Sequence, residues 1–201
     1  MFTLVTRSMK ENSPTLRETY CAELRAFGVA ASLAPLGRPE ESCPGHFAVF
    51  SGLTKDDPGA ALIDVRGSPI RWVNVVAYLG DDHVTVNALY YYGVPDARRL
   101  PRIGCLRGTR VRTFPLFGRV VDVRWRGDDH GMSIVSSLSA DAAIKEGVMG
   151  LGSFLNDPCV EFCPEHSCWV LTQPRYLVDS RGKWDLFERI AERLLAAPLP
   201  G

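Results

Sequence analysis

The sequence lacks long apolar runs. No segment approaches the roughly 18–20 apolar residues that span a bilayer, and the stretch before Arg7 is shorter than the apolar region of about 7–15 residues in a secretory signal peptide. The apolar share of 46% and the charged share of 23% are those of ordinary globular proteins. We therefore expect a cytoplasmic protein without a membrane partner.

The sequence also lacks net charge. Its 23 lysines and arginines balance 23 aspartates and glutamates, so the whole chain has no general attraction to nucleic acids or anionic membranes. On this ground a nucleic-acid partner is not expected.

Signatures of catalysis are missing too. The sequence contains no Gly-x-Ser-x-Gly, no Gly-x4-Gly-Lys-Ser/Thr, no Gly-x-Gly-x-x-Gly and no His-Glu-x-x-His. Its four histidines all lie in turn-like settings, so few side chains are suited to shuttle protons. The sequence favours a protein that is not an enzyme, and it identifies no catalytic residue.

What the sequence does contain is a series of short apolar runs between turn signals. An amphipathic helix is predicted from Ser13 to Gly28, with an apolar face made by Leu16, Tyr20, Leu24 and Phe27. Residues 29–45 are predicted to be a loop. Strands are predicted at residues 47–50, 61–65, 72–79, 84–92, 109–114, 119–125 and 132–138. Their connections are too short for parallel crossovers, so the sheet should be largely antiparallel.

The C-terminal part is predicted to hold two helices around a β-hairpin. Ser139 caps the first helix, and the second has a wide apolar stripe and an i,i+4 pair of Asp185 with Arg189. The hairpin between residues 157 and 172 alternates apolar residues toward a helix-covered core. We expect five side chains to be buried together: Phe162, Trp169, Trp184, Phe187 and Leu194.

These elements predict an α+β fold with a largely antiparallel, partly curled sheet and three packing helices. A chain of 201 residues is short enough for a single domain, residues 1–201. Residues 93–102, which contain two prolines and a dibasic pair, are the one candidate for an internal division.

Arginines are concentrated in one stretch. Between Arg98 and Arg126 there are nine arginines and one acid, Asp122, so this stretch carries a charge of +8. Alternation with Val123 and Trp125 predicts an exposed anion-binding site made by Arg110, Arg112, Arg124 and Arg126. A solvated face without a ligand is the alternative, because 19 of the 23 basic residues are arginines.

The six cysteines are expected to be free, because disulfides are rare in the cytosol. Cys-Pro-x-His occurs twice, and thiolates and imidazoles at such spacing can bind zinc. The candidate ligands are Cys43, His46, Cys159, Cys163, His166 and Cys168. A disulfide between Cys163 and Cys168 is another alternative. We expect structural roles for these residues and no cofactor, with zinc as the alternative.

The predicted order of elements from Arg119 onward is two strands, a helix, two strands and a helix. This order is similar to that of small bacterial secretion-chaperone-like domains, and the resemblance implies binding of a protein partner on a sheet or helix face. We therefore expect a non-enzymatic, cytoplasmic protein-binding domain of the chaperone-like or adaptor kind. Two alternatives remain: a metal- or thiol-dependent protein centred on the Cys159–Cys168 hairpin, and a binder of anionic ligands or nucleic acid that uses Arg98–Arg126.

Overall fold

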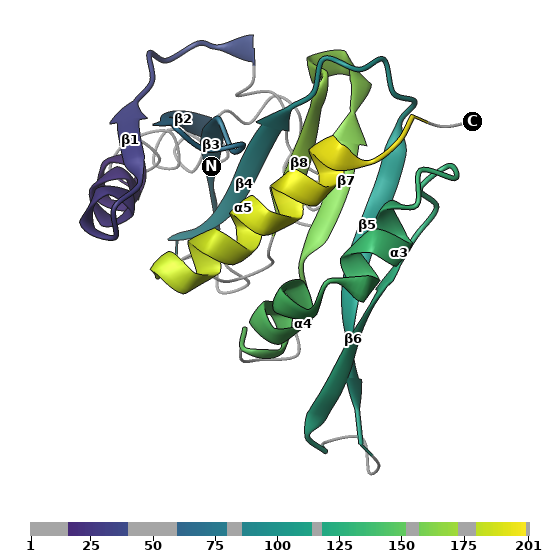
Figure 1. The fold of residues 1–201 in the computed structure, drawn as a ribbon. Helices are drawn as coiled ribbons and strands as arrows, with labels where there is room; N and C mark the ends of the chain where they lie inside the picture. Colours follow the sequence, from purple (N-terminus) through teal and green to yellow (C-terminus); the bar gives the residue numbers. More distant parts are fainter. Residues whose placement is uncertain are drawn as a thin grey trace.

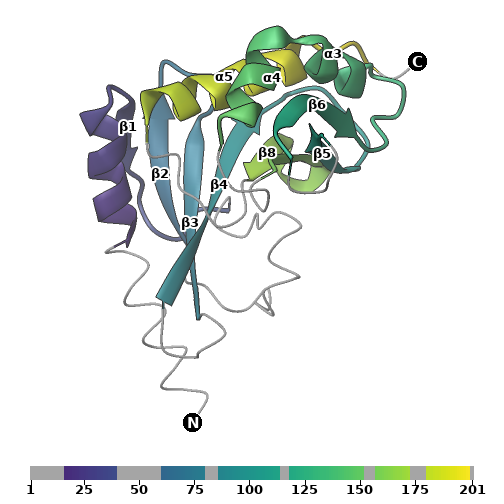
Figure 2. The ribbon, with the colours of Figure 1, turned by 90° about the horizontal axis from the view of Figure 1, so that it is seen from below.

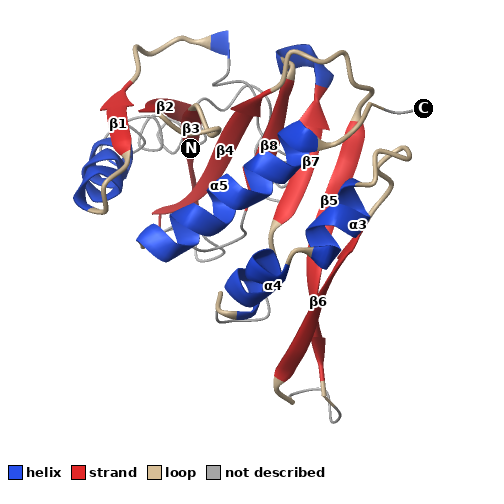
Figure 3. Cartoon of the chain, in the orientation of Figure 1, coloured by secondary structure: helices blue, strands red, loops and turns tan. Residues whose placement is uncertain are grey.

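The computed structural model describes residues 16–39, 60–79, 86–113, 118–151, 157–172 and 180–199. Within these ranges the chain forms eight strands and four α-helices, which confirms the α+β class (Figure 3). The strands are β1 (Ala30–Leu33), β2 (Ala60–Arg66), β3 (Trp72–Leu79), β4 (Val86–Pro95), β5 (Ile103–Arg112), β6 (Val120–Arg126), β7 (Cys159–Cys163) and β8 (Cys168–Thr172). The α-helices are residues 16–26, α3 (Ile134–Ala140), α4 (Ala142–Met149) and α5 (Arg181–Ala196). No helix among the described residues is long and apolar enough to cross a membrane.

The strands form one open sheet in the order β1-β2-β3-β4-β8-β7-β5-β6 (Figure 1). Every neighbouring pair is antiparallel, as the short connections predicted. The hairpin of β7 and β8 lies in the middle of this sheet. It turns through a single 3-10 turn, η2 (Pro164–His166), so that Cys163 lies directly opposite Cys168.

The main core lies between one face of the sheet and the helices. Figure 2 shows α3, α4 and α5 together on one side of the sheet. The five aromatic and aliphatic side chains predicted to be buried together all belong to this core, which confirms the prediction: Phe162, Trp169, Trp184, Phe187 and Leu194. The rings of Phe162 and Trp169 meet edge to face with centroids 5.1 Å apart.

The helix at residues 16–26 packs on the same core. Tyr20 and Leu24 are buried, and the Tyr20 hydroxyl hydrogen-bonds the Tyr92 hydroxyl at 2.8 Å. Gly28, with a φ of 88°, allows the left-handed turn that follows the helix. The predicted apolar face and end of this helix are confirmed, while its predicted start lies outside the described residues.

The opposite face of the sheet carries a second buried cluster, which the sequence did not predict. It includes Trp72, Tyr91 and Val170. The Trp72 ring lies over Gly93, its cross-strand neighbour, so closely that a Cβ at Gly93 would come within 1.9 Å of it. The middle of the sheet is therefore buried on both faces, and Gly93 is needed because no other residue leaves room for the indole.

A buried polar network fixes the chain just after β4. Asp96 accepts hydrogen bonds from the Trp169 indole nitrogen at 2.9 Å and from Arg98 Nε at 2.8 Å. Burial alone would raise the pKa of Asp96, but the hydrogen bonds from Arg98 outweigh it and lower the pKa. Arg98 also donates to the carbonyl of Leu194 at 2.8 Å, near the end of α5. Residues 96–98 thus join β4, β8 and α5.

Three predicted elements are wrong. Residues 132–138, predicted as a strand, overlap helix α3, in which Ile134 and Leu138 lie four apart and are both buried. Asp141, not Ser139, caps the following helix. The predicted loop at residues 29–45 contains the short strand β1. The observed order from β6 onward is therefore strand, two helices, two strands and helix, which differs from the order that supported the chaperone resemblance.

Candidate functional site

The β5–β6 hairpin extends beyond the rest of the sheet. The first half of β5 pairs with β7 as far as Arg107, which lies opposite Cys159. From Arg107 onward β5 pairs with β6. Figure 1 shows the two strands continuing past the end of β7. Beyond Arg107 the hairpin therefore has no third strand among the described residues.

The register places Arg110 on the covered side of this hairpin. Arg110 lies directly opposite Val123, which belongs to the main core, so the two side chains share the covered face. The Arg110 side chain is only 2% exposed and forms an ion pair with Asp157 at 2.9 Å. The predicted exposed site of four arginines is thus wrong for Arg110.

Arg112 does not lie beside Arg124 and Arg126 either. A register shift between Val111 and Arg112 places Arg112 opposite Val120, where it is half-buried. Its guanidinium donates a hydrogen bond to the carbonyl of Gly118 at 3.2 Å. The Arg112 side chain is therefore bound near the far end of the hairpin and does not belong to an exposed group with Arg124 and Arg126.

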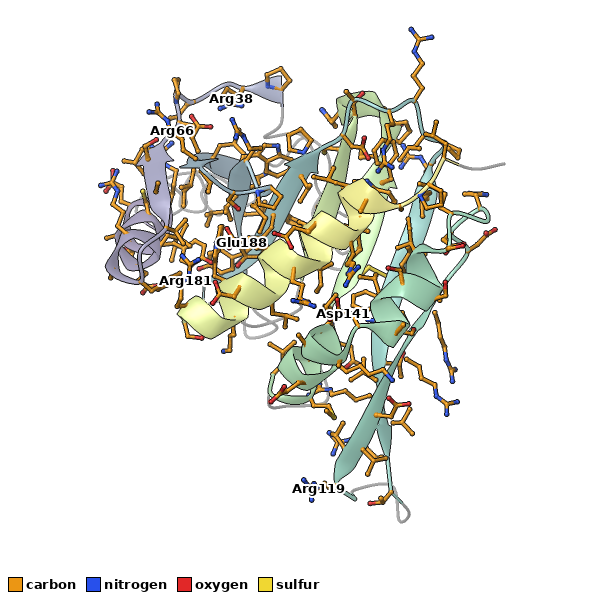
Figure 4. The ribbon with its side chains drawn as sticks, viewed as in Figure 1. Arg38, Arg66, Arg119, Asp141, Arg181 and Glu188 are labelled. Atoms are coloured by element: carbon orange, nitrogen blue, oxygen red, sulfur yellow. A yellow bond between two sulfur atoms is a disulfide. The ribbon has the colours of Figure 1, made fainter. Side chains whose placement is uncertain are left out.

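Three arginines share the outer face of the hairpin instead. Arg107 lies directly opposite Arg126, and Arg124 lies on the same face opposite Thr109. All three side chains are exposed. We call Arg107, Arg124 and Arg126 the arginine face. The exposed Arg119 lies at the far end of the same hairpin (Figure 4).

One acid of the hairpin, Asp122, is bound more closely by α4 than by the arginine face. Asp122 accepts a hydrogen bond from Lys145 at 2.8 Å, whereas its distance to Arg124 is 3.5 Å. The hydrogen bond from Lys145 and one from the Val123 backbone N–H lower the pKa of Asp122, so it stays ionised. The Arg124 side chain is 64% exposed, and a surface pair of this kind contributes little. Asp122 therefore neutralises Arg124 only weakly.

Side chains occupy both edges of the sheet. At β6 the backbone N–H of Trp125 donates to the Ser139 hydroxyl at 3.0 Å, and the Val123 N–H is bound by Asp122. At β1 the carbonyl of Ala31 accepts from Arg25 at 2.7 Å. Edge strands protected in this way do not readily add a strand from another chain.

The cysteines of the central hairpin do not form the local zinc site that was the alternative to structural roles. Cys159 is bonded to Cys105, with Cα atoms 5.7 Å apart, so the expectation of free thiols is wrong for this pair. Cys159 and Cys163 lie at opposite ends of β7, about 13 Å apart at the usual rise of a strand. Cys43 and His46 lie outside the described residues.

Cys163, His166 and Cys168 lie at the turn without forming a ligand set. Cys163 and Cys168 are free thiols, and the Cys163 thiol donates to Glu165 at 3.2 Å. Glu165 also forms an ion pair with Arg102. Among the described residues, no group of three or more His, Cys, Asp or Glu side chains could hold a metal.

Sequence reasoning missed the carboxylate that joins α4 to α5. Asp141 caps α4 by accepting from the Ala143 and Ile144 N–H groups, both at 3.1 Å. It also accepts from Arg189 at 2.8 Å and from Arg193 at 2.7 Å (Figure 4). Arg189 was predicted to pair with Asp185 on its own helix. Asp at a helix start was the available signal, but its partners on α5 could not be read from local spacing.

Arg189 and Arg193 therefore stabilise the contact between α5 and the start of α4. Arg189 and Arg193 line a surface depression together with Glu192 and Ala196, and both are bound to Asp141. Among the described residues of the arginine-rich stretch, the arginine face is the exposed group that can meet a ligand. Comparison of the chain with protein-family models, with curated proteins and with solved structures finds no match.

Proposed function

We propose that this chain is a non-enzymatic protein-binding domain of the cytoplasm, and that its arginine face binds an acidic segment of a partner protein. The observation that carries the proposal is the register of the hairpin, which sets Arg107 directly opposite Arg126 with Arg124 on the same exposed face. Each guanidinium can bind a carboxylate through two parallel hydrogen bonds.

The arrangement costs the free protein stability. Like charges directly opposed across two strands are destabilising, by an amount on the order of 0.2–1 kcal/mol. On the covered side of the same hairpin, Arg110 forms a close ion pair with Asp157. An acidic partner would place carboxylates beside the exposed Arg124 and Arg126, as Asp157 does beside Arg110.

An acidic protein segment fits the arginine face better than a nucleic acid does. Single-stranded nucleic acids bind where aromatic side chains stack on the bases next to the positive charge. Here Trp125 is on the covered side of the hairpin, and Tyr91 and Tyr92 are buried in the sheet. The chain has no net charge to attract a phosphate backbone from a distance.

The partner is bound through side chains and not through strand addition. The outward N–H groups of Trp125 and Val123 on β6 are already occupied by Ser139 and Asp122. A partner segment is therefore expected to lie across the outer face of the hairpin, where the three guanidinium groups are exposed.

The proposal is tested with two probes of equal charge, a peptide rich in Asp and Glu and a single-stranded oligothymidylate. Fluorescence anisotropy should show binding of the peptide, weakened at least tenfold between 50 and 500 mM salt, and weaker binding of the oligonucleotide. The double variant Arg124→Glu with Arg126→Glu should lose peptide binding. Arg181→Glu, on α5, is the control and should retain it.

Two results contradict the proposal. Tighter binding of the oligonucleotide would make the arginine face a nucleic-acid site. Peptide binding that survives the double reversal would place the acidic ligand elsewhere on the chain.

A further inference from the structure

We infer that Cys105 and Cys159 form a site of reversible thiol oxidation that fastens the base of the β5–β6 hairpin to β7. Their sulfurs are bonded, and their Cα separation of 5.7 Å lies within the range of ordinary disulfides. The inference rests on the placement of the two cysteines, and its reversibility rests on the cytoplasmic location proposed above; it does not depend on the binding of an acidic segment.

The pair owes its position to an irregularity in β5. Ile103 lies opposite Phe162 and Leu106 lies opposite Val160, so β5 has one residue more than β7 over this stretch. Both Ile103 and Leu106 are buried in the main core. The extra residue turns Cys105 away from that core and toward Cys159, which is the arrangement expected of a β-bulge.

The bond lies where the hairpin leaves the sheet. Cys159 is directly opposite Arg107, the last residue of β5 that pairs with β7 and the first that pairs with β6. Gly127 follows β6 at the base of the hairpin, where an added Cβ would come within 3.0 Å of the Cys105 carbonyl oxygen, and its φ of 141° suits glycine. Closing the disulfide therefore restrains both strands at their base.

The second cysteine pair provides an internal contrast. Cys163 and Cys168 are directly opposed on β7 and β8, yet they remain free thiols. Directly paired Cβ atoms in a ladder lie about 4.5–5.5 Å apart, which is wider than a relaxed disulfide prefers. Each pair thus has one member on β7, and of these two pairs only Cys105 with Cys159 is bonded.

Cys105 is more exposed to solvent than Cys159, so its sulfur is expected to react first. Cys105 is half-buried, whereas Cys159 is 1% exposed. The Cys105 thiolate attacks a low-molecular-weight disulfide such as oxidised glutathione and releases one thiol; the Cys159 thiolate then attacks Cys105 and releases the second. The two cysteines give up two protons and two electrons, and the small disulfide becomes two thiols. A dithiol reductant reverses the sequence. In a cytoplasmic protein, disulfides are usually of this transient kind.

The experiment oxidises the fully reduced chain with glutathione disulfide and maps its thiols by differential alkylation and mass spectrometry. We expect the loss of two alkylatable thiols, at Cys105 and Cys159, and their recovery with dithiothreitol in the folded protein. Oxidation should raise the melting temperature by roughly 5–15 °C, because the bond closes a long loop. Hydrogen exchange should slow in β5 and β6 and stay unchanged in α5.

Matched variants separate this site from general thiol reactivity. Cys105→Ser should abolish the response of the melting temperature to oxidant, and Cys163→Ser should leave that response intact. Cys105 and Cys159 that stay alkylatable in excess oxidised glutathione would overturn the inference. So would a bond that dithiothreitol cannot reduce unless the chain is unfolded, because it would then be permanent.

Discussion

Arg107 and Arg126 occupy directly opposed positions on β5 and β6, and both side chains are exposed. Replacing one of them should therefore stabilise the free protein, because like-charge repulsion is removed and a β-branched residue suits a strand. We predict that Arg126→Thr raises the free energy of unfolding by about 0.3–1 kcal/mol in low salt. Urea denaturation measures this, and the gain should shrink in 0.5 M salt.

Arg119→Thr is the control for that experiment, since Arg119 precedes β6 and has no arginine opposite it in the described register. Its effect should stay within about 0.3 kcal/mol. Destabilisation by Arg126→Thr would mean that the side chain is structural, and the argument for a ligand at this position would fail.

The two sides of the hairpin should respond differently to the loss of an arginine. Arg110→Ala leaves Asp157, 20% exposed, without its partner in a largely buried setting, and should cost about 2–4 kcal/mol. Arg124→Ala removes an exposed side chain and should cost less than about 0.5 kcal/mol. Denaturant midpoints of the two variants measure the difference. Equal effects would contradict the register that separates the two faces.

Gly93 and Gly104 offer a second matched pair. A Cβ at Gly93 would lie 1.9 Å from the Trp72 ring, whereas one at Gly104 would meet nothing within 4 Å. Gly93→Ala should cost about 2–4 kcal/mol, because the buried indole must shift, and Gly104→Ala should change stability by less than about 1 kcal/mol. Thermal melts would show whether the second buried cluster depends on this contact. A harmless Gly93→Ala would contradict the close packing of Trp72.

Asp141 should make stability sensitive to acid. Burial alone would raise its pKa, but hydrogen bonds from Arg189, Ile144 and Arg193 lower the pKa from 3.8 to about 2. Because the folded-state pKa is the lower one, the ionised carboxylate stabilises the fold above about pH 4, and this contribution is lost as pH falls toward 2. Denaturation between pH 2 and 7 should show this loss.

Asp141→Asn should reduce stability at pH 7 and make the decline below pH 4 shallower. The control is Asp185→Asn, because Asp185 is 55% exposed and pairs with Arg181 on the same helix. An acid profile of Asp141→Asn that matches the unaltered protein would show that another carboxylate is responsible.

Local patterns were sufficient to predict much of the fold. The period-two runs predicted β2, β3 and the β7–β8 hairpin, and the aromatic stripe predicted the buried face of α5. They failed for α3, because the spacing of Ile134 and Leu138 fits a strand as well as the helix that forms. A short apolar run can fit both the period of two residues in a strand and the period of 3.6 residues in a helix. Tertiary packing then decides which structure forms.

The candidate site is formed by contacts between residues that are distant in the sequence, and no local pattern predicts such contacts. The sequence located the arginine-rich stretch, but the register of β5 on β6 decided that Arg110 is buried and that Arg107 joins the exposed face. The bond between Cys105 and Cys159 joins residues separated by 54 positions and depends on the irregular pairing of β5 with β7. The ion pairs of Asp141 likewise join the start of α4 to α5, which is distant in the sequence.

The central claim is that the arginine face recognises an acidic segment through its charge, and a charge exchange tests it most directly. Binding is measured by isothermal titration for the unaltered chain and for Arg124→Glu with Arg126→Glu, each with an Asp/Glu-rich peptide and with the same peptide carrying lysines instead. The account predicts that the unaltered chain binds the acidic peptide and not the lysine peptide, and that the double variant binds the lysine peptide at least tenfold more tightly than the acidic one. Unchanged binding of the acidic peptide by the double variant, together with no gain for the lysine peptide, would contradict it.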